Sequence, residues 1–117
     1  MRTAIFLAAM LLASTAYAAD RKMPPKFVGE WCGLNGSTTH TRGRCRDPSS
    51  DARLTVSVNG YRWHETDCKV VSVADLPKKG SYQIKARCRG EGETWSENNT
   101  ISLDNKGRLI FGGTRGS

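Results

Sequence analysis

The side chains with the most reactive chemistry in this sequence are its four cysteines, Cys32, Cys45, Cys68 and Cys88. Thiols can act as nucleophiles, bind zinc or form disulfides. Structural zinc sites use closely spaced pairs such as Cys-x-x-Cys, which this sequence does not contain, so no bound metal is expected. An even number of cysteines in a small chain with an export signal is typical of a disulfide framework. We therefore expect two disulfides rather than a reactive thiol.

The two histidines are the remaining candidates for proton transfer near neutral pH. His40 lies in a segment rich in serine and threonine, and His64 falls on the outward face of a predicted hairpin. Both are expected to be surface side chains. Because no catalytic or cofactor motif is present either, the sequence predicts a non-enzymatic protein with no catalytic residues and no cofactor.

The first 18 residues have the features of a secretory leader. A charged start at Arg2 precedes an apolar run, and Ala16-Tyr17-Ala18 provides the small-x-small cleavage signature. We expect cleavage before Ala19 and a periplasmic or secreted protein. No later apolar stretch is long enough to span a membrane. The remaining chain is divided into an N-terminal arm, residues 19–26, and one domain, residues 27–117.

Alternating apolar and polar residues predict strands through most of that domain. In the first hairpin, Asn59-Gly60 is expected to form a type I′ turn that pairs Val58 with Tyr61 and Val56 with Trp63. A change in which residues face inward then requires a turn or bulge, expected at Thr66-Asp67.

Two later segments, residues 68–74 and 82–88, are predicted strands that each contain one cysteine. If Cys68 lies opposite Cys88, the apolar residues between them share one face, which favours a Cys68–Cys88 bridge and leaves Cys32 to pair with Cys45. Four cysteines permit three pairings, so the register selects among them. Val71 and Val73 then lie on the opposite face, either as an association patch or because this register is wrong.

Further turns are expected at Glu91-Gly92, which places Cys88 and Trp95 on one face, and at Asn105-Lys106-Gly107. The sequence therefore predicts an all-β, antiparallel up-and-down meander that closes into a barrel of about eight strands with two disulfides. The alternative is a β-sandwich. Closure is favoured because it removes exposed strand edges.

The segment Gly29-x-Trp31 on the first expected strand resembles the glycine-x-tryptophan signature of the calycin superfamily, which comprises lipocalins and smaller bacterial relatives. In size the chain is most similar to periplasmic metalloprotease inhibitors, eight-stranded barrels that plug a protease with an N-terminal arm. The resemblance implies that Trp31 closes the barrel floor under an arginine from near the C-terminus. Arg108 and Arg115 are the candidates for that arginine.

The formal net charge of +7 indicates a basic protein. A basic rim could bind an anionic ligand or an acidic partner. Its candidate residues are Arg42, Arg44, Arg46, Lys78 and Lys79. Nucleic acid is not expected, because the chain is exported and shows no RNP-like or helix-turn-helix pattern. An acidic patch, Glu91, Glu93 and Glu97, could bind a cation but is expected to solvate a hairpin.

Two functions are consistent with these features. The first is a non-enzymatic, exported binding module that recognises a partner or an anionic ligand through its rim and loops. The alternative is a periplasmic inhibitor of an exported protease that acts through its arm, in which two prolines favour an extended conformation. The candidate residues of the arm are Arg21, Lys22, Met23, Pro24 and Pro25. The identity of the partner and the oligomeric state are not encoded in these patterns.

Overall fold

The computed structural model describes residues 22–34, 37–47 and 50–116 of the 117-residue chain. The expected leader and residues 19–21 of the arm, with Arg21, lie outside the described residues. A short 3-10 helix, η2 (Pro25–Phe27), precedes eight strands. The strands are β1 (Gly29–Gly33), β2 (Thr39–Arg42), β3 (Arg53–Ser57), β4 (Gly60–Trp63), β5 (Thr66–Asp75), β6 (Tyr82–Gly90), β7 (Glu93–Leu103) and β8 (Leu109–Gly116).

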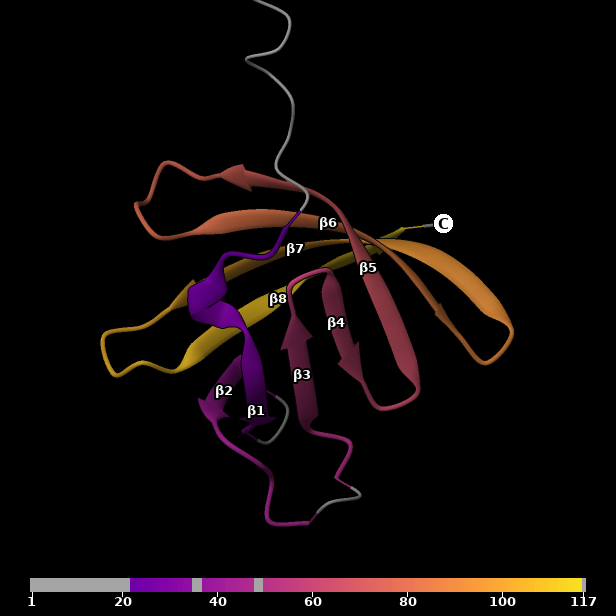
Figure 1. The fold of residues 1–117 in the computed structure, drawn as a ribbon, viewed down its shortest axis with the longest axis horizontal. Coiled ribbons are helices and arrows are strands. Elements are labelled where there is room, and N and C mark those ends of the chain that lie inside the picture. The colour runs from indigo at the N-terminus through magenta and orange to yellow at the C-terminus, as the bar shows by residue number, and fades with distance from the viewer. Residues whose placement is uncertain (1–21, 35–36, 48–49, 117) are drawn as a thin grey trace, which may run out of the picture.

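The eight strands form a closed antiparallel barrel, which confirms the predicted fold class (Figure 1). From β3 to β8 each strand pairs with the next along the chain, as in an up-and-down meander. The first two strands depart from that order, since β3 pairs with β1, and β2 closes the barrel against β8. In the described part of the chain, no helix has the length and apolar character needed to cross a lipid bilayer.

The β3–β4 hairpin forms, but its register differs from the prediction by two residues: Val56 was expected opposite Trp63. Val56 lies opposite Tyr61, and the two-residue turn consists of Val58 and Asn59, neither of which has a positive φ. The glycine is required for packing instead, because a Cβ on Gly60 would overlap the carbonyl oxygen of Cys68 in β5. The shift keeps Leu54, Val56 and Tyr61 in the core, whereas Val58 lies in the turn and is 47 % exposed.

The next turn is also displaced from its predicted place. Trp63 pairs with Thr66, so the chain reverses at His64 and Glu65, with His64 at φ +50°, and not at Thr66-Asp67. His64 therefore lies in a turn and not within a strand. Tyr61 then lies opposite Cys68, and both side chains are buried. The inward-facing residues change parity through this turn, without a bulge.

Strands β5 and β6 pair Cys68 with Cys88 and Val70 with Ala86, as expected. Between Val70 and Ser72 the register shifts by one residue, so that Val73 pairs with Ile84 and turns into the core. Val71 is left outside, 49 % exposed. The β-bulge explains why strict alternation placed Val71 correctly but wrongly put Val73 on the same outer face.

Both disulfides form with the favoured pairing, Cys32–Cys45 and Cys68–Cys88. The two remaining turns also agree with expectation. Glu91 and Gly92 both have positive φ and place Cys88 opposite Trp95. The turn that ends at Gly107 pairs Leu103 with Leu109. These turns join β6, β7 and β8, and β7 carries Glu97 and Asn99, whose side chains are hydrogen-bonded to each other.

The described part of the N-terminal arm closes one end of the barrel. Met23 is 2 % exposed, and its N–H donates to the carbonyl of Val58 just after β3, 2.8 Å away. Phe27 is fully buried and packs edge-on against Tyr82, while Lys26 donates to Gly80 in the β5–β6 loop. In Figure 1 the indigo segment runs beside this end of the barrel. The barrel core therefore begins before residue 27.

We call the buried residues Met23 and Phe27 the plug of the barrel. Trp31 lies fully buried beside this plug, and its indole N–H donates to the carbonyl of Phe27, 3.0 Å away. The guanidinium of Arg42 stacks on its ring, with 4.1 Å between the guanidinium carbon and the ring centroid. Gly29 makes the stack possible, because it has φ +144° and a Cβ there would lie 3.0 Å from Arg42 Nη1. The arginine over Trp31 thus comes from β2 and not from positions 108 or 115.

Candidate ligand site at the open end of the barrel

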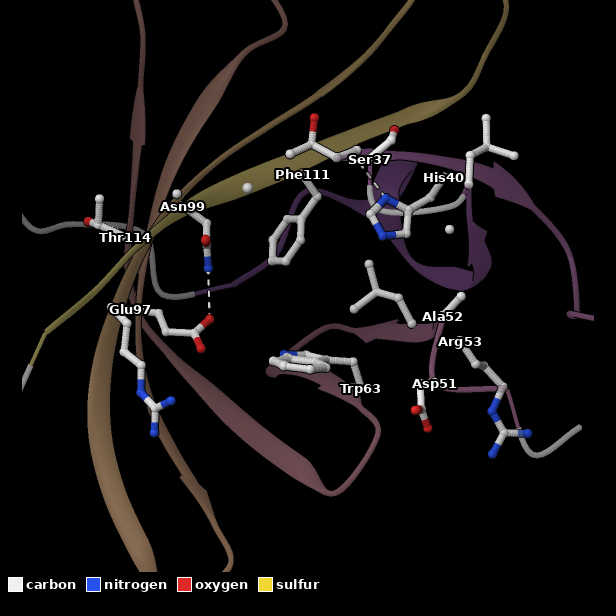
Figure 2. A pocket seen from close by; sticks show the side chains of 17 residues that line it. Ser37, His40, Asp51, Ala52, Arg53, Trp63, Glu97, Asn99, Phe111 and Thr114 are labelled. Atoms are coloured by element: carbon white, nitrogen blue, oxygen red, sulfur yellow. Dashed lines mark hydrogen bonds between the residues drawn. The ribbon is translucent and has the colours of Figure 1, made fainter.

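The end of the barrel opposite the plug contains a cavity of about 370 Å³. It lies where β1 ends and β3 begins, and the inner faces of β4, β7 and β8 form its walls. Figure 2 shows His40, Trp63, Asn99 and Phe111 around it. Its lining includes Leu34, His40, Asp51, Arg53, Trp63, Glu97, Asn99, Phe111 and Arg115. We call this cavity with its rim the mouth.

A hydrogen-bonded polar cluster lies inside the barrel, at the base of the mouth. The Glu97 carboxylate accepts hydrogen bonds from Tyr61 Oη at 2.8 Å, Trp95 Nε1 at 2.9 Å and Asn99 Nδ2 at 3.0 Å. Asn99 Nδ2 also donates to Tyr61 Oη, 2.7 Å away. Burial, and then the nearby Glu97 charge, raise the pKa of Tyr61 far above its usual value. Tyr61 therefore stays neutral and remains a donor.

Cysteine sulfurs approach this cluster without forming a metal site. Cys68 Sγ, Cys88 Sγ and a Glu97 oxygen all lie within 4.8 Å of one another, a spacing found among metal ligands. Both sulfurs are joined in a disulfide, so neither is a thiolate that could bind zinc. The arrangement is best explained by packing of the disulfide beneath the carboxylate.

Apolar side chains are exposed at the mouth. Trp63 is 39 % exposed and Leu34 is 43 % exposed, and both line the cavity. Phe111 forms the deeper wall and packs edge-on against Tyr61, with 4.9 Å between ring centroids. Large apolar side chains held at the entrance of a cavity are typical of binding sites, since a folded chain otherwise tends to cover them.

Two of the charged residues at the rim, Arg115 and Asp51, have partners within the protein. Arg115 stacks on Trp95, with 3.8 Å between the guanidinium carbon and the ring centroid, and lies 3.9 Å from Glu93. Asp51 Oδ1 lies 2.8 Å from Nδ1 of His64 in the β4–β5 turn. These contacts connect the loop before β3 to the β4–β5 turn, and the end of β8 to the start of β7.

The predicted basic rim does not form one surface. Arg42 is committed to Trp31 and to the carbonyl of Lys26, 2.9 Å away, and Arg44 Nε lies 3.5 Å from Glu30. The exposed Arg46 follows on the β2–β3 connection, at the bottom of Figure 1. The exposed Lys78 and Lys79 belong to the β5–β6 loop, which lies at the upper left of Figure 1, away from the β2–β3 connection. None of the five lines the cavity.

The other predicted site residues are also placed. Arg108 forms an ion pair with Asp104 in the β7–β8 turn, 2.7 Å apart, and lies away from Trp31. Lys22, Pro24 and Pro25 lead into η2, with Met23 buried between them. Glu91 and Glu93 are exposed as expected, whereas Glu97 was wrongly grouped with them and lies in the polar cluster.

Glu97 and Asn99 are the site residues that the sequence patterns missed. They stand two positions apart on β7, between the inward-facing Trp95 and Ile101. Polar residues at inward-facing positions of a strand are costly unless they are hydrogen-bonded, and therefore indicate a specific polar interior. That parity argument applied to β7 could have identified both.

We expect His40 to make the stability of the barrel depend on pH. Burial lowers the pKa of His40 below its usual 6.5, against the opposing effect of the backbone carbonyls of Thr38 and Leu109. The unfolded chain therefore takes up a proton at a higher pH than the folded barrel. We expect the free energy of unfolding to fall as the pH drops below about 6.5. Urea unfolding at several pH values should show a smaller fall in a His40→Gln variant, and identical pH curves would contradict this role of His40.

The fold and the cavity together define a small closed antiparallel β-barrel that is plugged at one end and open at the other. No family model, curated protein or solved structure was found to match the chain.

Proposed function

We propose that this protein is a non-enzymatic binding module that takes up a ligand, or one side chain of a partner, in the mouth of its barrel. The observation that carries this proposal is the cavity of about 370 Å³ with Trp63 and Leu34 exposed at its entrance. Its volume lies near the lower end of the range for small-molecule sites. A group of modest size would fit, and a long lipid chain would not.

The two ends of the barrel support binding at the mouth. At the plugged end Met23, Phe27 and Trp31 fill the interior and are almost fully buried. Entry there would require the plug to leave, which would expose these large apolar side chains to water. At the mouth, the polar groups of Glu97 and Asn99 are already held in place by hydrogen bonds, so they need little reorganisation on binding.

An anionic ligand is less well supported than the basic composition suggested. The five basic residues expected to recognise it are divided between different sides of the molecule or engaged with Trp31 and Glu30. Separated charges do not create the concentrated field that would bind a small anion. The proposal therefore rests on the cavity and not on net charge.

Inhibition of a protease by the N-terminal arm is the alternative function. The arm would have to extend into a cleft of the target, whereas Met23 is buried and hydrogen-bonded to Val58. Withdrawing Met23 would expose a large apolar side chain, at a cost of roughly 1.5–3 kcal/mol before any binding begins. This weighs against a mechanism that uses residues 19–25 as one free segment.

We also propose that the protein works in the periplasm or outside the cell. The support comes from the two disulfides, which persist in oxidising compartments, and from the leader-like residues at the start of the sequence. The resemblance to the calycin superfamily belongs to the same proposal. It is supported by the stacked Trp31 beside Gly29, while the exchanged order of β1 and β2 departs from a simple up-and-down barrel.

A neutral fluorescent probe, N-phenyl-1-naphthylamine, tests binding at the mouth without involving charge. We expect saturable binding, with an increase in probe fluorescence, and about tenfold weaker binding by a Trp63→Ala variant because an aromatic contact is lost. Val71→Ala is the matched control, since Val71 is also exposed but lies on the outer face of β5. Equal loss of binding in the two variants, or no saturable binding, would refute the mouth as the site.

A further inference from the structure

The carboxylate inside the barrel has no cationic partner within the described residues. No lysine, arginine or histidine nitrogen in the described part of the chain lies within 4.0 Å of the Glu97 oxygens. Arg115, which is opposite Glu97 in the β7–β8 register, stacks on Trp95 and lies near Glu93 instead. The charge of Glu97 is held by three neutral hydrogen-bond donors.

Those donors do not use the full capacity of the carboxylate. Oε1 accepts from Tyr61 and Asn99, and Oε2 accepts from Trp95. A carboxylate offers about four acceptor positions, so one position on Oε2 is left for a ligand. Glu97 lines the cavity, and its side chain lies beside Asn99 there in Figure 2.

Aromatic side chains stand beside this carboxylate. The Trp63 ring lies across the cavity in Figure 2, with Phe111 on the neighbouring wall and Glu97 toward one side. Ammonium and guanidinium groups are attracted to the faces of such rings, most strongly to that of tryptophan. A carboxylate and a tryptophan in one partly desolvated cavity favour a cation over a neutral or anionic group of the same shape.

We propose that the mouth recognises an organic cation with N–H donors, an ammonium or guanidinium group that donates to Glu97 Oε2 and packs against the Trp63 ring. This inference rests on the proposed function, because it assigns a ligand class to the same cavity. The cation is carried either by a small free amine or by a basic side chain of a partner. These two sources share one head-group chemistry and differ in the rest of the molecule that carries it.

The overall charge of the protein sets a condition on this binding. At a formal net charge of +7 the protein repels cations at long range, so the attraction must arise from short-range contacts in the mouth. The lining of the mouth carries Asp51 on the side opposite Glu97, and it also includes Arg53 and Arg115. Arg115 is stacked on Trp95 and lies 3.9 Å from Glu93. We therefore expect added salt to leave the affinity for a cation unchanged or slightly higher.

Three probes of nearly equal shape separate charge from fit: benzylammonium, benzyl alcohol and benzoate. Each is titrated into the protein while amide and indole resonances are followed by NMR. We expect benzylammonium to bind roughly tenfold more tightly than benzyl alcohol, and benzoate to bind most weakly. A Glu97→Gln variant should lose the preference for ammonium and retain benzyl alcohol. Glu93→Gln, a change at an exposed glutamate of the same strand, should keep the preference.

The outcomes distinguish this inference from the function on which it rests. Binding of benzyl alcohol or benzoate at the mouth with no preference for benzylammonium would overturn the cation and leave the mouth as a binding site. Failure of all three probes to shift mouth resonances would overturn both. If Glu97→Gln does not fold, the ranking of the three probes on the unaltered protein still decides.

The source of the cation is resolved by a second pair of probes, N-acetyl-lysine methylamide and N-acetyl-norleucine methylamide. A roughly tenfold preference for lysine over norleucine, lost in Glu97→Gln, supports a basic side chain of a partner as the natural ligand. Binding of benzylammonium without any lysine preference supports a free amine. A norleucine analogue that binds better than the lysine analogue, together with no benzylammonium preference, would contradict the inference.

Discussion

A Trp31→Ala variant should lose about 3–5 kcal/mol of unfolding free energy, the usual cost of emptying a fully buried tryptophan site. Trp31 is 0 % exposed, donates to the Phe27 carbonyl and supports the guanidinium of Arg42. Removal of the indole leaves a cavity beneath the plug and an arginine without its stacking partner. Urea unfolding followed by circular dichroism measures the loss.

Trp63→Ala is the matched control for that measurement. Trp63 is 39 % exposed at the mouth, and its truncation removes much less buried surface. We expect the Trp63 variant to lose roughly 1 kcal/mol or less. Equal losses at the two positions would show that Trp31 does not organise the plugged end.

Replacing Cys68 and Cys88 together by alanine should lower the free energy of unfolding by about 3 kcal/mol, because the unfolded chain is no longer cross-linked. The bridge spans 20 residues and joins β5 to β6 beneath Glu97, and both cysteines are at most 2 % exposed. The double variant avoids a free thiol. Differential scanning calorimetry of the oxidised proteins gives the difference in unfolding free energy.

The second disulfide provides the comparison. Cys32–Cys45 spans 13 residues and tethers the β2–β3 connection to β1, with Cys32 only half-buried. Its closed loop is shorter and its sulfurs pack less of the core, so we expect a smaller loss from the corresponding double alanine variant. A larger loss there would mean that the barrel depends chiefly on the β2–β3 connection and not on the β5–β6 hairpin.

Local patterns predicted much of the fold because each has a direct physical cause. Alternation identified the strands, the facing cysteines set the β5–β6 register up to Val70, and the glycines at positions 92 and 107 marked turns that need a positive φ. Asn59-Gly60 predicted the wrong turn position, because Gly60 is required by its close contact with the backbone of Cys68 in β5 and not by the turn. A tertiary contact of this kind leaves no local signature.

The remaining differences come from longer-range effects. The bulge at Val71 turns Val73 inward, and alternation alone cannot locate an extra residue. The pairing of β3 with β1 depends on how the β2–β3 connection, tethered by Cys45, runs past β1. Arg42 stacks on Trp31 because it lies directly opposite in the β1–β2 register, which became known only with that pairing.

The candidate site was harder to predict than the fold. Basic residues were prominent in the sequence, yet the barrel separates their loops. The mouth instead uses Trp63, which the sequence analysis gave no role in a site, and Glu97, which it placed in solvent. A site inside a barrel is defined by which residues face inward at one end, and this requires the register of every strand.

The most direct test of binding at the mouth is to map where a ligand contacts the barrel. Two-dimensional amide NMR spectra of the ¹⁵N-labelled protein, recorded with increasing N-phenyl-1-naphthylamine, report each end of the barrel separately. We predict the largest shifts at the mouth, including the Trp63 indole and the amides of Gly33 and Gly112, with Met23 and Phe27 unmoved. Shifts concentrated at Met23, Phe27 and the β5–β6 loop would contradict binding at the mouth, because the ligand would then enter through the plug.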